Sequence, residues 1–371
     1  MFSMFFGAGN VVFPLITGQL AQNHYISAIL GLLLTAVGVP FLGLMAMTLF
    51  NGDSHAFFSR IGKIPGFLLA AGILALIGPL GGMPRVITVS YSTTNMFFPG
   101  LSLPIFSALF CLAIFFFTYR RSRIIELLGK VLTPLLLGSL LILIIKGLIS
   151  AQPMGQSAFT EQQMFWNALK EGYNTMDLMG AFFFSSVVIL CLKQGFTPDE
   201  TPDLKHLVRM TFRASCIGAL LLGLSYIGFL TTAAYHSSTL ASVSPEALLG
   251  TLALNILGPF AGIIAIAAVA LACLTTAIAL AAVFAEFLHE EIFKYKLGFV
   301  PSLALTLIAS FFISLLKFQG IMGILATILL YFYPALIVLS AVNLAYKLWN
   351  FTPVKIPFWT TLALTAAYYS Y

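Results

Sequence analysis

The first apolar run of the chain contains a stretch that disfavours a regular helix, Gly7-Ala8-Gly9-Asn10, with Pro14 four residues further on. Glycine lowers the cost of leaving helical geometry, and its missing Cβ lets a ligand approach the backbone. An unwound stretch exposes carbonyl groups to a cation, and the N–H groups that open the next half-helix can bind a carboxylate. Close packing of small residues between helices is the simpler interpretation of an isolated Gly-x-Gly. The rest of the chain decides between the two.

The composition is that of a polytopic membrane protein. Of 371 residues, 60% are hydrophobic and 8% are charged, whereas a soluble domain carries roughly 25% charged residues. A membrane helix needs about 20 apolar residues, so about 10 to 12 spans use most of the chain. Soluble enzymes and nucleic-acid-binding proteins are therefore excluded. The net charge of +6 is explained by the basic residues that collect in cytoplasmic loops.

Short polar clusters divide the chain into eleven predicted spans. The runs are rich in Leu and Ala and lack the period-two alternation of barrel strands, so all of them are predicted to be helices. The first run starts without a leader and the last run is short, so we expect a chain that is shortened at its ends. The predicted spans are 2–22, 26–49, 66–98, 103–119, 128–149, 163–192, 210–235, 248–285, 299–316, 320–346 and 357–371.

The basic residues give the orientation. Of the 18 Lys and Arg residues, 14 lie in the loops that follow the even-numbered spans, and the opposite loops are nearly free of them. The positive-inside rule places these basic loops and the N-terminus in the cytoplasm. The residues concerned are Arg60, Lys63, Arg120, Arg121, Arg123, Lys130, Lys193, Lys205, Arg209, Arg213, Lys294, Lys296, Lys347 and Lys355.

This orientation predicts an inverted repeat within a single transporter domain, 1–371. The first span starts inside and the sixth starts outside, so five spans are followed by five of opposite topology. We predict a first repeat over 1–150, a second over 160–347 and a partial extra helix over 348–371. In secondary transporters built this way, discontinuous helices form the binding site. Spans one and six are therefore both expected to be broken.

Span six carries a matching break signal, Gly172-Tyr173-Asn174-Thr175-Met176-Asp177-Leu178-Met179-Gly180. Asp177 is the carboxylate that lies deep in a predicted span. An ionisable residue at such a depth is a functional-site hypothesis by default. Two interpretations remain open for Asp177: direct contact with a ligand, or capping of backbone N–H groups at the break.

Span eight contains adjacent hydroxyls, Thr275-Thr276. They can supply oxygen ligands to a small cation, or they can bond back to carbonyls one turn earlier. Beside the carbonyls of span one, cation coordination is the favoured interpretation.

Span three contains Gly78-Pro79-Leu80-Gly81-Gly82-Met83-Pro84-Arg85, and Tyr91 follows it. The prolines and glycines predict a bend or a break. Arg85 has three candidate partners: Asp177, a substrate carboxylate, or backbone carbonyls that line a gate.

Enzymatic motifs are absent from the sequence. It contains no His-Glu-x-x-His, no paired intramembrane carboxylates and no Walker lysine motif. We therefore expect no enzyme activity, no catalytic residue, no cofactor and no transition metal.

Several of these segments resemble, in order, the bacterial branched-chain amino acid:cation symporter family (LIVCS). The matching segments cover spans one to eight. They are Phe5-Phe6-Gly7-Ala8-Gly9-Asn10-Val11-Val12-Phe13-Pro14, Leu34-Thr35-Ala36-Val37-Gly38-Val39-Pro40, Ile77-Gly78-Pro79 with Pro84-Arg85, Gly129-Lys130-Val131-Leu132-Thr133-Pro134, Glu171-Gly172-Tyr173 with Thr175-Met176-Asp177, and Leu271-Ala272-Cys273-Leu274-Thr275-Thr276-Ala277.

The resemblance implies an all-α membrane protein with a LeuT-type five-plus-five inverted repeat and broken helices one and six. Members of that family usually have twelve spans. It also implies uptake of leucine, isoleucine and valine across the bacterial cytoplasmic (inner) membrane, coupled to Na+ or to H+. The expected partners are these small substrates and the lipid bilayer, without nucleic acid.

The same resemblance implies roles for individual residues. The carbonyls near Ser3 and Phe6 would form a sodium site with Thr275 and Thr276. The residues expected to cradle the substrate are Gly7, Ala8, Gly9 and Asn10 with Thr175, Met176, Asp177 and Gly180. Gating or structural roles fall to Arg85, Tyr91 and Pro14.

Two alternatives to sodium-driven uptake remain open. A proton-coupled transporter of the same fold would place the titrating group at Asp177. A non-transporting amino acid sensor would bind substrate without net flux, although no sizeable soluble domain is left to relay a signal. The sequence does not separate leucine from isoleucine or valine, since one methylene shifts selectivity by only about 1–3 kcal/mol.

Overall fold

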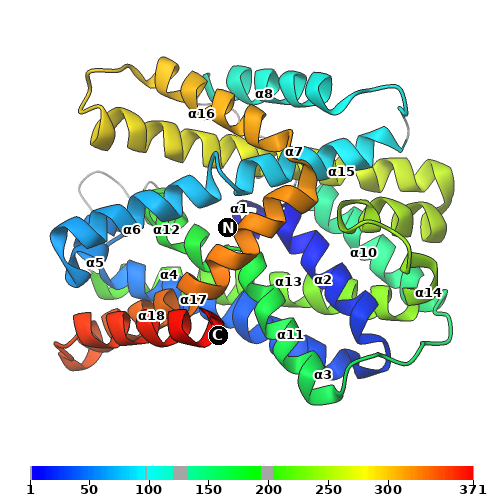
Figure 1. The fold of residues 1–371 in the computed structure, drawn as a ribbon, viewed down its shortest axis with the longest axis horizontal. Coiled ribbons are helices and arrows are strands. Elements are labelled where there is room, and N and C mark those ends of the chain that lie inside the picture. Colours follow the sequence, from blue (N-terminus) through cyan, green and yellow to red (C-terminus); the bar gives the residue numbers. More distant parts are fainter. Residues whose placement is uncertain (1, 97, 120–132, 194–203, 371) are drawn as a thin grey trace.

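The computed structural model describes residues 2–96, 98–119, 133–193 and 204–370. These residues form helices and short connections, with no strand among them (Figure 1). By length and composition, five helical stretches of the described residues are sufficient to cross a membrane. They are Ala8–Leu49, Lys63–Asn95, His206–Tyr235, Val269–Ile292 and Lys317–Trp349, and the first of them contains two predicted spans. Shorter apolar helices, such as Leu103–Tyr119 and Phe299–Ser314, account for other predicted spans.

The first five predicted spans correspond to the first half of the helices. A 3-10 turn, η1 (Gln22–His24), joins the first two spans, and the short segments α5 and η3 precede the third. The elements are α1 (Phe2–Phe5), α2 (Ala8–Ala21), α3 (Tyr25–Leu33), the π-helical turn η2 (Leu34–Gly38), α4 (Val39–Leu49), α5 (Ser54–Phe58), η3 (Ser59–Ile61), α6 (Lys63–Ile77), α7 (Gly82–Asn95), α8 (Leu103–Tyr119) and α10 (Thr133–Ile149).

The later spans correspond to the second half. The elements are α11 (Glu161–Asn174), α12 (Asp177–Lys193), α13 (Leu204–Tyr235), α14 (Ser237–Leu240), η5 (Pro245–Ala247), α15 (Leu248–Phe287), the π-helical turn η6 (Leu288–Ile292), α16 (Phe299–Ser314), α17 (Lys317–Trp349) and α18 (Lys355–Ser370). The predicted repeat boundaries are not tested by this architecture and stay predictions.

The predicted breaks in spans one and six are confirmed. In span one, α1 ends at Phe5 and α2 begins at Ala8, with Gly7 extended between them (φ −123°, ψ −166°). In span six, α11 ends at Asn174 and α12 begins at Asp177, with Met176 in the left-handed region (φ 61°). Residues other than glycine rarely adopt this region, so the surrounding packing must hold Met176 there.

Two other spans are interrupted as well. Span three divides between Ile77 and Gly82, where the glycines and Pro79 predict a bend or a break. Span eight was expected to be one helix over 248–285, and this was wrong in one respect. Gly258 has non-helical dihedrals (φ 76°, ψ 176°), so α15 is two helical segments that meet at a kink. Only glycine adopts such a conformation at little cost.

The helices of the two halves pack against each other in pairs. Helix α2 packs along α13, α3 packs along α11, and α4 packs along α12. A second group joins α7, α8, α15 and α16, at the top of Figure 1, while α2, α3, α11 and α13 lie below it. The N-terminal segment α1 lies between these groups and contacts α12, α13 and α15. The broken ends of spans one and six are thereby brought together at the centre of the molecule.

Candidate functional site

A hydrogen-bonded group of side chains joins the two breaks. The Asn10 side chain accepts a hydrogen bond from the N–H of Gly7 at 2.9 Å. Its amide nitrogen donates to the two carboxylate oxygens of Asp177 at 2.9 and 2.7 Å. Asn10 and Asp177 are 3% and 5% exposed, respectively. The first turn of α2 is thus tied to the first residue of α12, inside the protein.

Tyr226 of α13 completes this group. Its hydroxyl donates to Asp177 Oδ2 at 2.8 Å and accepts a hydrogen bond from the Asn10 amide. The Asp177 carboxylate therefore bonds across to α2 and α13, while Thr175 Oγ1 accepts from the N–H of residue 177 at 3.5 Å. This arrangement differs from the capping role considered for Asp177. Direct contact of the carboxylate with a ligand stays a prediction.

Tyr333 of α17 supports the other side of the break in span six. Its hydroxyl accepts a hydrogen bond from the N–H of Leu178 at 3.2 Å, and its ring stacks on Tyr173 with centroids 4.6 Å apart. The N–H groups in the first turn of a helix have no partner within the helix. Tyr333 satisfies one of those of α12, and the same side chain packs against the end of α11.

Arg85 lies in the first turn of α7 and is 5% exposed. Its Nη1 donates to the carbonyl of Asn174, the last residue of α11, at 2.6 Å. Of the three partners considered for Arg85, the structure contains the backbone carbonyl. The Cζ atom also lies 5.3 Å from the ring centroid of Phe13. Within the described residues, Arg85 Nε is buried without a hydrogen-bond partner.

Gly9 lies against the guanidinium group of Arg85. A Cβ atom at residue 9 would lie 2.7 Å from Arg85 Nη2, closer than real Cβ contacts occur. The guanidinium group can occupy its position only because residue 9 has no side chain. Gly9 thus serves close approach between α2 and α7, in addition to the helix break.

The two threonines of span eight differ from each other. Thr276 Oγ1 is buried and donates toward the carbonyl of Phe6, in the break of span one, at 3.4 Å. Thr275 Oγ1 instead donates to the carbonyl of Ala272, one turn earlier in α15, at 2.8 Å. Bonding back within the helix therefore holds for Thr275, whereas Thr276 faces the break of span one, and cation coordination by the pair stays a prediction. Ser3 lies in α1, but its side chain is outside the described part of the chain.

A cavity of about 50 Å³ lies between the breaks. All eight residues predicted to cradle the substrate line it, together with Thr276 and Arg85. Phe6, Thr275, Tyr91 and Pro14 do not line it. The lining consists of Gly7, Ala8, Gly9, Asn10, Arg85, Thr175, Met176, Asp177, Gly180 and Thr276, with the apolar residues Phe5, Ile77, Gly82, Val86, Phe184 and Leu280.

Tyr91 and Pro14 lie apart from this cavity. The Tyr91 ring lies 5.6 Å from that of Phe106 in α8. Pro14 is buried inside α2, which continues through it, so the helix breaks at Phe6 and Gly7 rather than at the proline. The gating role expected for Tyr91 stays a prediction.

Sequence reasoning missed the two tyrosine hydroxyls and the apolar part of the lining. The lining had a signal: Phe184 lies four residues after Gly180 and Leu280 four residues after Thr276, one helical turn in each case. Tyr226 and Tyr333 carried only the general signal that a tyrosine hydroxyl in an apolar run needs a partner.

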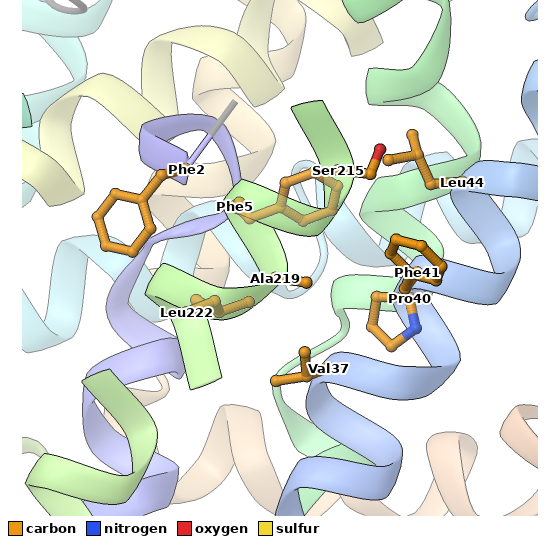
Figure 2. Close-up of a pocket in the computed structure, with 10 residues that line it drawn as sticks. Phe2, Phe5, Val37, Pro40, Phe41, Leu44, Ser215, Ala219 and Leu222 are labelled. Carbon is orange, nitrogen blue, oxygen red and sulfur yellow. The ribbon is translucent and has the colours of Figure 1, made fainter. Parts of the chain in front are cut away.

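A second pocket lies beside α1 (Figure 2). It encloses about 30 Å³, and Phe5 lines both this pocket and the central cavity. Figure 2 shows Phe2 and Phe5 of α1 on one side and Val37 and Pro40 of the second span on the other. Its lining is almost wholly apolar, so it offers packing for α1 rather than polar chemistry.

Comparison with solved structures supports a LeuT-type fold. The structure titled MhsT in complex with L-phenylalanine superposes with a TM-score of 0.60 at 15% identity, covering 99% of this chain and 96% of that chain. The inward-facing conformation of Mhp1 gives a TM-score of 0.61 at 13% identity, covering 99% and 88%. At these identities the likeness shows the fold alone, and it confirms the expected fold class.

Sequence comparison shows the family. The branched-chain amino acid permease BraB of Bacillus subtilis is 30% identical over 366 residues, covering 94% of this chain and 79% of the permease. The permease BrnQ of Corynebacterium glutamicum is 31% identical over 350 residues, covering 93% and 79%. The family model described as "Branched-chain amino acid transport protein" matches residues 1–370. The chain therefore belongs to the branched-chain amino acid transport protein family, a family of membrane transporters rather than enzymes.

Proposed function

We propose that this protein imports leucine, isoleucine and valine across the bacterial cytoplasmic membrane, driven by the sodium gradient, with its N-terminus in the cytoplasm. The observation that carries the sodium assignment is the meeting of the Thr276 hydroxyl with the Phe6 carbonyl, at 3.4 Å. Phe6 follows the last residue of α1, so its carbonyl is at the C-terminal, partially negative end of a half-helix. Unwound carbonyls and such helix ends coordinate Na+ in transporters with broken helices.

The central cavity offers groups of opposite character for the ends of an amino acid. The N–H groups of Ala8 and Gly9 belong to the first turn of α2 and have no acceptor within the helix. Together with Arg85 Nε they would bind the substrate carboxylate. The substrate ammonium group would lie toward Asp177 and the C-terminal end of α11, which are both negative.

The apolar lining fits a branched aliphatic side chain. Ile77, Val86, Phe184 and Leu280 come from four different helices and line the same cavity as the polar groups. A water molecule needs at least about 10–15 Å³ of cavity, so the 50 Å³ present is room for roughly four water molecules. An amino acid is larger than this cavity, so its binding requires the two breaks to move away from α7 and α15.

Coupling follows if cation and substrate favour the same states. A sodium ion between Phe6 and Thr276 would tie α1 to α15, and a substrate at Gly7 and Thr175 would tie the breaks together. The binding of each then strengthens the binding of the other by the same coupling free energy. Such coupling is what lets a sodium gradient drive uptake.

Uptake of radiolabelled leucine into proteoliposomes tests the proposal. One set of vesicles carries an imposed sodium gradient, and another carries a pH gradient. We expect accumulation under the sodium gradient alone, and loss of most sodium dependence in Thr276→Ala. Unchanged sodium activation in folded Thr276→Ala would refute the cation site, and absence of uptake under both gradients would refute the function.

A proton-coupled mechanism is the second candidate. It is favoured by the position of Asp177, a buried carboxylate whose hydrogen bonds run to the neutral side chains Asn10 and Tyr226. A carboxyl group between the two breaks can carry a proton as they open and close. In that case the pH gradient alone drives uptake, and Asp177→Asn abolishes it. Sodium-driven uptake that persists in Asp177→Asn excludes this mechanism.

A further inference from the structure

A large apolar groove opens between α6, α17 and α18, away from the central cavity. It encloses about 570 Å³. Leu68, Gly72 and Leu76 of α6 form one wall, and Phe332 of α17 and Leu362 of α18 form the other. The lining between Pro65 and Leu76 runs along about 16 Å of α6 at 1.5 Å per residue. That length is about half of the hydrocarbon thickness of a bilayer, which is about 30 Å.

The groove has the dimensions and the chemistry of a site for hydrocarbon. Ligand pockets enclose about 300–1,000 Å³ and are mostly apolar. Leu68 is 63% exposed on its wall. In a membrane-spanning protein such a surface meets lipid, and a lipid chain fills it without leaving a polar group unsatisfied. The length matches one acyl chain from one leaflet.

The mouth of the groove is basic. Helix α6 begins at Lys63 and helix α18 begins at Lys355, and η3 packs against α18 at this end. Figure 1 shows both helices starting on the same side of the molecule. Each helix start adds a partial positive charge and free N–H groups, which favour a phosphate.

Arg60 in η3 adds a third basic group. Its Cζ atom lies 3.6 Å from the ring centroid of Tyr346 at the end of α17. Its Nε atom is buried and has no hydrogen-bond partner in the described part of the chain. The sequence contains no Asp or Glu over 54–77 or over 317–371. Glu286, Glu290 and Glu291 share a separate pocket with Lys63, so the charge is of one sign only along the segments that form the groove, η3, α6, α17 and α18.

We propose that this groove binds an anionic phospholipid. One acyl chain lies between α6, α17 and α18, and the phosphate group lies among Lys63, Lys355 and Arg60. Arg60, Lys63 and Lys355 belong to the loops that the positive-inside rule places in the cytoplasm, so the lipid comes from the cytoplasmic leaflet. A zwitterionic lipid has no net charge to match the three basic groups, so it binds more weakly.

The lipid would also contact the transport machinery. Met179 of α12 lines the groove, and its neighbour Gly180 lines the central cavity. An acyl chain in the groove thus packs against α12 within its first turn after the break. The binding itself does not depend on which substrate or coupling ion the protein uses.

Native mass spectrometry of the purified full chain tests the proposal. The protein is titrated with phosphatidylglycerol or with phosphatidylcholine, and the retained lipid is counted at each concentration. We expect phosphatidylglycerol to be retained preferentially. The double variant Lys63→Gln, Lys355→Gln should bind it about thirty-fold more weakly, since each lysine near an anionic headgroup contributes a factor of about five. Lys146→Gln, at an exposed lysine in the last turn of α10 that does not line the groove, is the charge control.

Gly72→Leu tests the groove itself. A Cβ at residue 72 meets no atom within 4 Å, so the new side chain enters the groove without a clash and the protein should fold. We expect loss of retained phosphatidylglycerol in this variant. Gly323→Leu in α17 is the matched control, because a Cβ there also meets nothing and residue 323 does not line the groove.

Four results would overturn the assignment. Equal retention of both lipids would show that the site does not select an anionic headgroup. Equal loss of lipid in Gly72→Leu and Gly323→Leu would show that the lipid does not bind in the groove. A change in the mass of the assembly from dimer to monomer in Gly72→Leu, without any bound lipid in the parent protein, would show that a second copy of the chain covers this face. Inorganic phosphate that raises thermal stability as much as phosphatidylglycerol does would also exclude the acyl chain.

Discussion

Asn10 and Asp177 are 167 positions apart in the chain, and the amide of one donates to the two carboxylate oxygens of the other at 2.9 and 2.7 Å. Each residue lies in the first turn of the half-helix that follows a break. Because α2 and α12 start at this contact, the buried pair ties the first turns of the two half-helices to each other. This pair is the structural link between the two halves of the proposed substrate site.

Replacement of Asn10 by alanine should destabilise the protein. The change leaves the buried Asp177 carboxylate without one of its donors, and hydrogen bonds to charged groups contribute about 1.5–3 kcal/mol. We expect the free energy of unfolding to fall by about 2–3 kcal/mol, measured by chemical denaturation in detergent. Asn255→Ala, at an exposed residue of α15, is the control and should change it by less than about 0.5 kcal/mol. Equal loss of stability in the two variants would contradict a stabilising role of the Asn10–Asp177 hydrogen bonds.

The adjacent threonines of α15 should differ in their effect on sodium activation. Thr276→Ala removes the hydroxyl that faces Phe6, so the sodium concentration for half-maximal uptake should rise about tenfold or more. Thr275→Ala removes a hydroxyl that bonds within its own helix and should leave this concentration nearly unchanged. Thr276→Ser should restore activation. A larger effect from residue 275 than from residue 276 would place the cation elsewhere.

Gly9→Ala should displace Arg85. The added methyl group would lie 2.7 Å from Nη2, so the guanidinium group must move away from the carbonyl of Asn174. We expect KM for leucine to rise, because Arg85 is also proposed to bind the substrate carboxylate. Kinetics of uptake measure this. Gly138→Ala in α10, where a Cβ meets no atom within 4 Å, should behave as the parent protein does.

The two tyrosine hydroxyls should each contribute to stability. Tyr333→Phe leaves the N–H of Leu178 unsatisfied, and Tyr226→Phe removes a donor from Asp177. Leaving a buried polar group without its partner costs about 1–3 kcal/mol, which thermal and chemical unfolding can detect. The comparison is Tyr331→Phe, whose hydroxyl bonds a carbonyl at Tyr369 near the end of α18, and a smaller loss is expected there. An equally large loss of stability in Tyr331→Phe would show that the hydroxyls at the break in span six contribute no more than other buried tyrosine hydroxyls.

The positions of the breaks were predictable because their signals are local. Glycines and polar residues such as Asn10 and Asp177 are conspicuous in apolar runs, because glycine disfavours a regular helix and a buried polar group needs a hydrogen-bond partner. The eight residues expected around the substrate come from these two segments, and they line one cavity. Residues that are neighbours in the sequence of a broken helix are also neighbours in space, so each group of four could be predicted without knowing the packing of the helices.

Partners from distant helices were not predictable in this way. Tyr226 and Tyr333 reach the break in span six from α13 and α17, and which face of those helices points inward depends on packing. The two threonines show the same limit within one helix. Successive residues of an α-helix differ by about 100° in direction, so only the rotation of α15 in the assembled protein decides that Thr276, and not Thr275, faces Phe6.

The π-helical turn Leu34–Gly38 has a consequence for the comparison of the two halves of the chain. A single π-helical turn holds one residue more than an α-helical turn, so everything from Val39 onward is rotated by about 100° relative to α3. No π-helical turn interrupts α13, the corresponding helix of the second half. An alignment of the two repeats therefore needs a one-residue gap in this turn, and without it each position of α4 is paired with a position of α13 that points about 100° away. A natural deletion of one residue there would look like a small change in sequence, although it would rotate the inward face of α4 by about 100° about the helix axis.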